Sequence, residues 1–335
     1  MAGVAFFVDF IAVGFFFYSY GIFFKSIAAE FGDSRLDVAI GITLTQGVGA
    51  MLAPFIGRAL DRYPLIRIMA LGALSMGTGF SLLSVVQSPF QFYLVLSIFV
   101  GFGAGAMGQL ATSKLVSNWF VRKRGTALGI AATGISVSGV IMPNISAYLV
   151  TEFGWRSGFL VYGLITLTLV VPLVLRLVIS RPEDVAQLPD GAKSQTELPA
   201  VKAPLRTKEF LGDRNFWLLV TIIGLLFCVQ SGTLIHMVPQ LTDRGISLQA
   251  ASLIAAATAG CGVFGKLAYG ALVDRWDTRH ALWLAISFQI VGQLIMLNTP
   301  DYFCFLLGAC SFGFGMGGIV PMQGAVVGAA FGRAS

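Results

Sequence analysis

The sequence predicts an all-α, polytopic membrane protein, and composition is the first observation that does so. Of the 335 residues, 56% are hydrophobic and only 11% are charged, and the mean hydropathy is +0.82. Soluble domains carry about 25% charged residues, so this chain has too few to cover a water-facing surface. Soluble enzymes, nucleic-acid-binding domains and disordered chains are therefore excluded as classes.

The second observation is a series of ten long apolar runs. A membrane-spanning helix needs about 20 apolar residues, and continuous runs of this length are helical rather than alternating strands. Charged residues fall between the runs, as connections require. The predicted spans are 4–24, 38–56, 66–86, 89–113, 125–150, 157–179, 216–236, 247–272, 281–299 and 302–331.

The third observation is the uneven distribution of Lys and Arg. With a cytoplasmic N-terminus, sixteen of these residues fall in cytoplasmic connections and four on the opposite side. Cytoplasmic loops carry an excess of Lys and Arg, so we expect this orientation in the cell inner (plasma) membrane. The net charge of +6 then reflects topology and lipid contact, not nucleic acid.

One connection differs from the others in length and composition. Residues 181–213 are polar and rich in Pro, which is typical of a flexible linker. The sequence therefore predicts an N-terminal six-helix bundle over 1–180, a cytoplasmic linker over 181–213 and a four-helix C-terminal bundle over 214–335.

Two motifs occur twice at nearly one spacing. The pattern G-x-x-x-D-R follows the second span and recurs 213 residues later after the eighth, and the glycine-rich stretch 101–105 recurs at 313–317. This spacing indicates a duplicated six-span unit, which is typical of secondary transporters. The motif residues are Gly57, Asp61 and Arg62 in the first half and Gly270, Asp274 and Arg275 in the second.

These loop motifs, the linker and the duplication together resemble the major facilitator superfamily. Within it, the stretches YGIFFK to EFGDSR (20–35), WFVRKRGTALG (119–129) and HMVP (236–239) resemble monocarboxylate-transporter-like proteins. The resemblance implies two pseudo-symmetric bundles around a central cavity. It also implies that each motif carboxylate is a gate, which accepts hydrogen bonds at a neighbouring helix end or pairs with a basic residue. The alternative is that these charges serve only topology and solvation.

The chain also departs from the family pattern. The family has twelve spans and this chain shows ten, so the bundles count 6 + 4 of an expected 6 + 6. Tyr63 and Pro64 interrupt the first loop motif where the family pattern continues. We interpret the chain as a fragment or truncated product rather than a ten-span design.

Lys266 is the most informative single residue. It stands eight positions before Asp274, about 12 Å into the eighth span, and an intramembrane cation indicates a functional site. The transporters that the chain resembles carry an Arg here, which attracts the substrate carboxylate. Lys keeps the charge but loses the bidentate geometry. The alternative is a lysine that extends to the membrane interface.

Four further polar residues are candidates for the site. Asp9 in the first span and His236 at the outer end of the seventh are candidates for proton coupling, or are simply solvated residues near the surface. Tyr18 and Asn118 are candidates for substrate contact, or they hydrogen-bond between helices.

Other motifs have simpler explanations. The G-x-G-x-x-G stretches at 103–108 and 313–318 lack the strand and helix context of a dinucleotide site, so we expect them to pack helices. The four cysteines lie in apolar runs without a CxxC pair, and the two histidines are far apart. No metal and no cofactor are expected.

The predicted function is secondary active transport of a small organic anion, similar to a monocarboxylate, together with a proton, by a monomer. Alternatives are transport of another small solute, anion exchange, or a truncated remnant that does not transport. A membrane-embedded enzyme would need clustered acids, histidines or Ser–His pairs at one depth, and the sequence shows none, so no enzymatic activity is expected.

Overall fold

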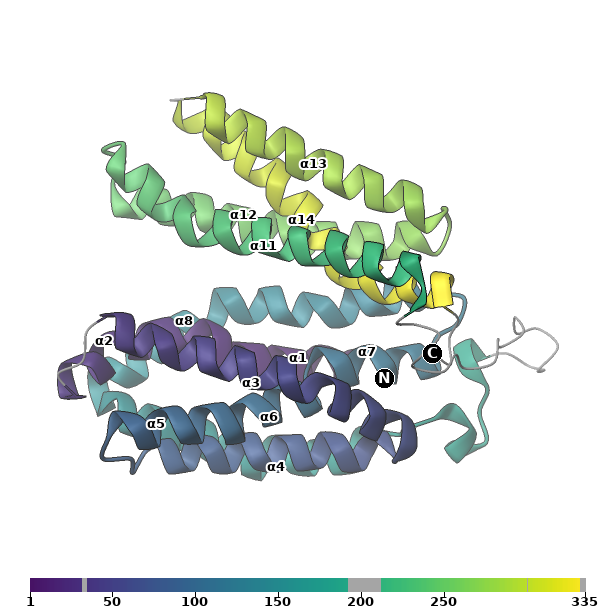
Figure 1. Ribbon diagram of the computed structural model, residues 1–335, viewed down its shortest axis with the longest axis horizontal. Helices are drawn as coiled ribbons and strands as arrows, with labels where there is room; N and C mark the ends of the chain where they lie inside the picture. The colour runs from purple at the N-terminus through teal and green to yellow at the C-terminus, as the bar shows by residue number, and fades with distance from the viewer. Residues whose placement is uncertain (32–34, 192–211, 300, 332–335) are drawn as a thin grey trace. The chain divides into compact units, whose positions relative to one another are not determined.

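The computed structural model describes residues 1–31, 35–191, 212–299 and 301–331. Within these ranges all regular structure is helical (Figure 1), which confirms the predicted fold class. The elements are α1 (Ala2–Val13), η1 (Gly14–Tyr18), α2 (Ser19–Phe31), α3 (Arg35–Arg62), α4 (Leu65–Leu83), α5 (Pro89–Val95), η2 (Leu96–Val100), α6 (Gly101–Met107), α7 (Gln109–Trp119), α8 (Arg124–Ile165), η3 (Thr166–Val170), α9 (Val171–Leu177), η4 (Pro182–Val185), η5 (Pro189–Gly191), α11 (Arg214–Asp243), α12 (Leu248–Val273), α13 (Thr278–Asn298) and α14 (Tyr302–Phe331).

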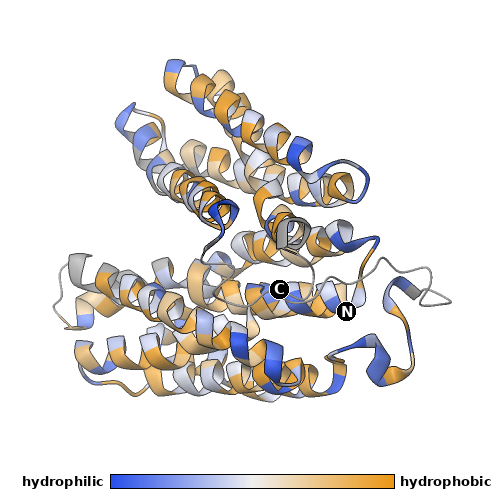
Figure 2. Ribbon diagram, turned by 45° about the vertical axis from the view of Figure 1, so that its right-hand side comes forward, coloured by the Kyte–Doolittle hydropathy of each residue, from blue (hydrophilic) through white to orange (hydrophobic). Residues whose placement is uncertain are grey.

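Eight stretches in the described residues are long and apolar enough to cross a membrane. One of them, Arg124–Leu177, is 54 residues long and therefore holds two crossings. Its helix is broken at Gly154, whose φ of 79° and ψ of 161° suit a residue without a Cβ. Ala2–Tyr18 is a shorter apolar helix that continues into α2. Figure 2 shows hydrophobic residues along the helices and hydrophilic residues at their ends.

Side-chain caps fix the start of several helices. Ser88 and Ser247 accept backbone N–H bonds from Gln91 and Ala250, at the beginning of α5 and α12. Asp301 accepts from the Cys304 N–H at 2.9 Å before α14. That hydrogen bond lowers the pKa of the Asp301 carboxyl, because it favours the charged form. The connections thus satisfy backbone groups that helix ends leave unpaired.

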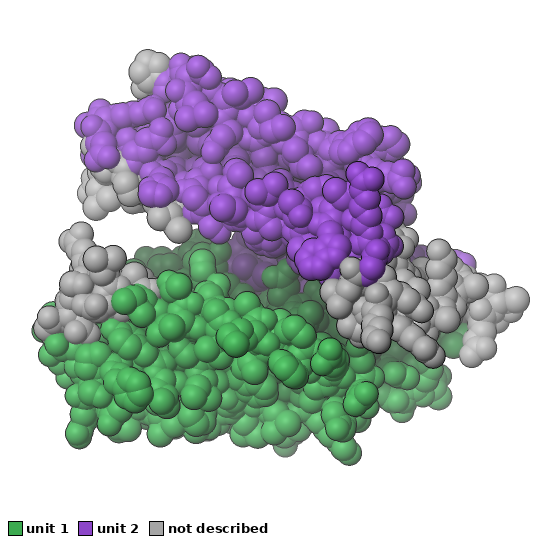
Figure 3. All heavy atoms as spheres, viewed as in Figure 1, with its two compact units in different colours: residues 1–119, 137–191 green, residues 120–136, 192–335 purple. Residues whose placement is uncertain are grey.

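The described chain forms two compact units, shown in Figure 3. Unit 1 holds residues 1–119 and 137–191, and unit 2 holds residues 120–136 and 192–335. The first part of α8 therefore belongs to unit 2 and the rest to unit 1. The predicted domain boundaries stay a prediction, and most of the linker at 181–213 lies outside the described residues.

An aromatic cluster forms the core of unit 1. Phe15 stacks on Tyr162 at 4.2 Å between ring centroids, and Phe23 stacks on Phe159 at 4.4 Å. The Tyr162 hydroxyl is 2.7 Å from the Ser146 hydroxyl, so the polar end of this ring is also satisfied. Offset aromatic pairs of this kind add stabilisation beyond the area they bury.

The glycine-rich repeats pack helices in both units, as predicted. A Cβ at Gly103 would lie 2.6 Å from the Met76 Cβ, and a Cβ at Gly315 would lie 2.9 Å from the Gln289 nitrogen. Met76 and Gln289 are themselves 213 residues apart. The duplication in the sequence is therefore a duplication of the same helix contact, in which small residues let two backbones meet.

We expect Gly103→Ala to destabilise unit 1. The new methyl group would overlap with Met76 and with the Gly72 carbonyl oxygen, 2.7 Å away, at a cost of about 1–3 kcal/mol. The control is Gly49→Ala in α3, where a Cβ meets nothing within 4 Å and Ala favours the helix. Thermal unfolding in detergent should show a lower midpoint for Gly103→Ala alone, and equal midpoints would contradict the packing role.

Candidate functional site

The first motif carboxylate pairs with a lysine on a neighbouring helix. Asp61, near the end of α3, forms a salt bridge with Lys114 of α7. Both line a cavity of about 280 Å³ that Arg62, Asn118 and Arg181 also line. Gly57 lies one turn before Asp61, and a Cβ there would meet nothing within 4 Å. The carboxylate of the first motif, Asp61, is thus paired with a basic residue, which is one of the two contacts that the resemblance implies.

Asn118 has a structural bond in the same region. Its amide donates to the Ser180 carbonyl at 2.9 Å, and the Trp119 indole donates to the Ile179 carbonyl at 2.8 Å. These bonds attach the segment after α9 to the end of α7. Asn118 therefore lies at the border of the Asp61 cavity, and its role as a substrate ligand stays a prediction.

The second motif carboxylate caps a helix instead. Asp274 accepts hydrogen bonds from the Gly125 N–H at 2.6 Å, the Thr126 N–H at 2.8 Å and the Thr126 hydroxyl at 2.6 Å. These donors begin α8, where backbone N–H groups point outward and favour negative charge. Arg275 is exposed to solvent. The carboxylate of the second motif, Asp274, thus accepts hydrogen bonds at a neighbouring helix end, which is the other contact that the resemblance implies.

Glycines bring α8 and α12 into contact along the stretch that begins at Asp274 and the first turn of α8. A Cβ at Gly125 would lie 2.4 Å from the Gly270 carbonyl oxygen, and one at Gly129 would lie 2.5 Å from the Lys266 carbonyl oxygen. The two helix backbones are therefore in direct contact. We call this contact, from Gly125 to Ser136 on α8 and from Asp274 to Lys266 on α12, the α8–α12 seam.

Lys266 lies at the far end of the seam. It is 5% exposed, as is Ser136, and its ammonium donates to the Ser136 hydroxyl. Ser136 stands ten residues beyond Thr126 on α8, about 15 Å along the helix. The ammonium therefore points deeper into the span and away from the Asp274 end, which is the opposite of what extension to the interface requires.

Asp9 and Thr112 form a buried pair in unit 1. The Thr112 hydroxyl of α7 lies 2.9 Å and 3.1 Å from the two oxygens of the Asp9 carboxylate on α1. Asp9 is only 2% exposed. It is therefore a carboxyl group inside the bundle rather than a residue near the surface.

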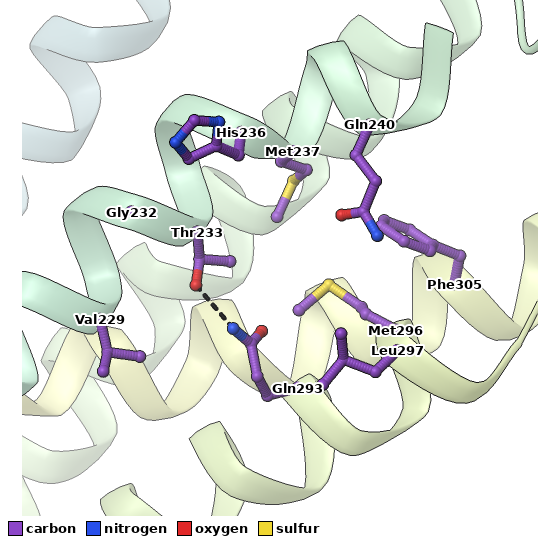
Figure 4. A pocket seen from close by; sticks show the side chains of 10 residues that line it. All are labelled: Val229, Gly232, Thr233, His236, Met237, Gln240, Gln293, Met296, Leu297 and Phe305. Carbon is purple, nitrogen blue, oxygen red and sulfur yellow. Dashed lines mark hydrogen bonds between the residues drawn. The ribbon is translucent and has the colours of Figure 1, made fainter. Parts of the chain in front are cut away.

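Tyr18 and His236 lie in different environments. The Tyr18 ring packs on α8, where a Cβ at Gly139 would come within 2.7 Å of it. His236 is exposed and contributes to a cavity of about 310 Å³ in unit 2, with Thr233, Gln240 and other residues. Figure 4 shows the imidazole at the edge of this cavity, and Thr233 accepts a 2.9 Å hydrogen bond from the Gln293 amide.

The architecture and these motifs agree with a comparison against known families. Residues 6–335 match the model of the Major Facilitator Superfamily. The chain belongs to this family. The relatives that the chain matches are themselves named transporters.

Curated relatives are similar at low identity. The chain is 27% identical over 318 residues to monocarboxylate transporter 11 of Homo sapiens, covering 91% of this chain and 64% of that protein. It is 24% identical over 328 residues to the uncharacterized MFS-type transporter YcxA of Bacillus subtilis, covering 92% of this chain and 75% of that protein. The chain is also 24% identical to human monocarboxylate transporter 2, and the match covers 89% of this chain and 66% of that protein. The chain thus spans about two thirds of the length of several relatives it matches.

A solved structure shares the fold. The crystal structure of a bacterial homologue of the iron transporter ferroportin, in an outward-facing state, has a TM-score of 0.69 with this chain. The match covers 99% of this chain and 85% of that chain at 13% identity. Identity this low supports the fold alone.

Three contacts at the site were not evident in the sequence. Nothing in the sequence pairs Lys114 with Asp61 or Thr112 with Asp9, and Ser136 is one of several serines in an apolar run. The available signal for Ser136 was its spacing, because it shares a helix face with Gly125 and Gly129. That face meets α12 only in the folded chain.

We expect Asp274→Ala to loosen the first turn of α8. Three hydrogen bonds disappear, and loss of a cap costs about 1 kcal/mol, so amide exchange at Gly125 and Thr126 should accelerate roughly fivefold. The control is Asp277→Ala, which removes the cap that Asp277 provides to the Arg279 N–H in α13. Hydrogen exchange measured by mass spectrometry should change at α8 only for Asp274→Ala; unchanged protection there would argue against the cap.

Proposed function

We propose that this chain is a secondary active transporter of a small monocarboxylate-like anion, coupled to a proton and working by alternating access as a monomer. The observation that supports the anion most directly is the buried ammonium of Lys266, directed at Ser136 inside the seam. Two relatives are named monocarboxylate transporters, which supports the same substrate class.

A carboxylate that leaves water needs a compensating cation. Removing an ion from water costs several kcal/mol, which an opposite charge in good geometry offsets. Lys266 provides that charge at membrane depth, where ionisable side chains are rare and mark substrate pathways. The ammonium donates to the neutral hydroxyl of Ser136. A carboxylate oxygen is a stronger acceptor than this hydroxyl, because it carries negative charge.

The two motif carboxylates are the proposed gates. Asp61 is bonded to Lys114 and Asp274 to the beginning of α8, and each bond stabilises one conformation. Alternating access requires these bonds to break in one state and form in the other. The nearby connections are rich in Arg, so we place this end of the spans, with the N-terminus, at the cytoplasmic face of the plasma membrane.

Asp9 is the stronger of the two proton-carrier candidates. A carboxyl group buried at 2% exposure can bind and release a proton while the hydroxyl of Thr112 remains its neighbour. His236 is exposed, and imidazole side chains serve as proton shuttles in other proteins. Its position at the edge of the unit 2 cavity keeps it as the second candidate.

Lys266→Gln should weaken anion affinity at least about tenfold, roughly 1.4 kcal/mol, because the cation is removed from a buried site. Lys266→Arg should retain most of the affinity, since the charge stays and the guanidinium fork suits carboxylates. Binding of lactate, pyruvate and oxalate to the chain in lipid nanodiscs measures both effects.

Lys123→Gln is the matched control for this experiment. It removes the same charge from a solvent-exposed lysine and should leave anion affinity within about twofold of the parent. If Lys266→Gln binds every tested anion as tightly as the parent, Lys266 is not the substrate cation and the anion assignment is wrong.

Asp9→Asn should abolish uptake driven by a pH gradient, because an amide side chain cannot bind and release a proton as a carboxyl group does. Anion exchange at equal pH should persist, since exchange needs no net proton movement. Both are measured in proteoliposomes with labelled lactate, and Thr112→Val serves as the control that alters the surroundings of Asp9 but keeps its carboxyl group. Loss of pH-driven uptake in His236→Gln, with Asp9→Asn intact, would assign the proton to His236.

A further inference from the structure

The Ser136 hydroxyl beside Lys266 can donate a further hydrogen bond. A serine hydroxyl has one O–H donor and two acceptor positions. Here it accepts from the Lys266 ammonium, so its own proton is available for a further acceptor. Both side chains are 5% exposed, which places this donor beside the cation and away from bulk water.

A carboxylate has two oxygens and is held best by two donors. An arginine supplies both from one planar guanidinium, whereas a lysine acts as a point charge. A lysine ammonium has three N–H donors, but they share one nitrogen instead of forming a planar fork. A second donor set apart from that nitrogen therefore has to come from another residue. The Ser136 hydroxyl lies within hydrogen-bonding distance of the ammonium, so both donors can face one carboxylate.

The seam holds this hydroxyl in place. Gly129 lies against the Lys266 carbonyl oxygen, and Gly125 lies against the Gly270 carbonyl oxygen. Ser136 follows these glycines on the same face of α8, so its position relative to Lys266 is set by backbone contact rather than by a flexible side chain. Fixed donors save the ordering that substrate binding would otherwise require.

A neighbouring hydroxyl shows the contrast. Thr133 is also buried on α8, at 7% exposure, but its hydroxyl donates to the Ile130 carbonyl of its own helix at 2.6 Å. That bond uses the Thr133 proton within the helix. Thr133 is therefore a suitable control for a buried α8 hydroxyl outside the pair.

We propose that Ser136 is a substrate ligand that determines specificity for carboxylates. In the anion-free chain its hydroxyl accepts from Lys266, and in the loaded chain it donates its proton to one carboxylate oxygen while Lys266 binds the other. Together the two residues provide the two-point recognition that one arginine would give. This inference rests on the proposed anion transport.

The test measures lactate affinity of the 335-residue chain in lipid nanodiscs. Ser136→Ala should weaken binding about tenfold, as expected for a lost hydrogen bond to a charged group. Ser136→Thr keeps the hydroxyl and should stay within about twofold of the parent, as should Thr133→Val. In the Lys266→Arg background, Ser136→Ala should cost less than about twofold, because the guanidinium already supplies two donors. A residue that only supports the structure would lower affinity equally in both backgrounds.

The outcomes separate this inference from the proposed function. Parent-like lactate affinity in Ser136→Ala, with binding lost in Lys266→Gln, overturns the role of Ser136 and leaves anion transport standing. An equal loss in the Lys266 and Lys266→Arg backgrounds also overturns it. If Lys266→Gln itself binds normally, or if the parent binds no carboxylate, the proposed function and this inference both fail.

Discussion

The direct contact of helix backbones at glycine is the constraint on which the other features depend. Lipid provides no hydrophobic force between helices, so close packing and hydrogen bonds must hold them together. In the α8–α12 seam, Gly125, Gly129 and Gly270 bring the two backbones into contact. The same contact places Asp274 at the first turn of α8 and Lys266 beside Ser136. A side chain at any of these glycines would separate both polar contacts at once.

The duplicated halves keep the packing of their helices but differ in their polar contacts. Gly103 lies against Met76 in unit 1, and Gly315 lies against Gln289 in unit 2 at the equivalent positions. The motif carboxylates have different partners, a lysine for Asp61 and a helix end for Asp274. Packing thus follows from small residues retained in both copies. The bonds of each carboxylate depend on which helix lies beside it.

The sequence was sufficient to predict the helices. The predicted run 66–86 corresponds to α4 at 65–83, because a span is defined by its own apolar residues. The run 38–56 is shorter than α3, which continues to Arg62, since helices extend beyond the membrane.

The partners Ser136, Thr112 and Lys114 were not predictable from the sequence. Each lies more than 50 positions from the residue it contacts, and a serine or threonine in an apolar helix more often bonds within its own turn.

The two carboxylate contacts differ in strength, and this difference indicates which of them controls opening. Asp61 and Lys114 have side chains that are 68% and 31% exposed, and ion pairs in such surroundings contribute about 0–1 kcal/mol and weaken with salt. Asp274 accepts three hydrogen bonds, two of them from backbone N–H groups at a helix start. Loss of such a helix cap costs about 1 kcal/mol and up to about 2 kcal/mol. Separating α12 from the beginning of α8 therefore costs more than separating Asp61 from Lys114. Because Lys266 lies on the same face of α12 as Asp274, a substrate bound at Lys266 acts on the helix that carries the stronger contact.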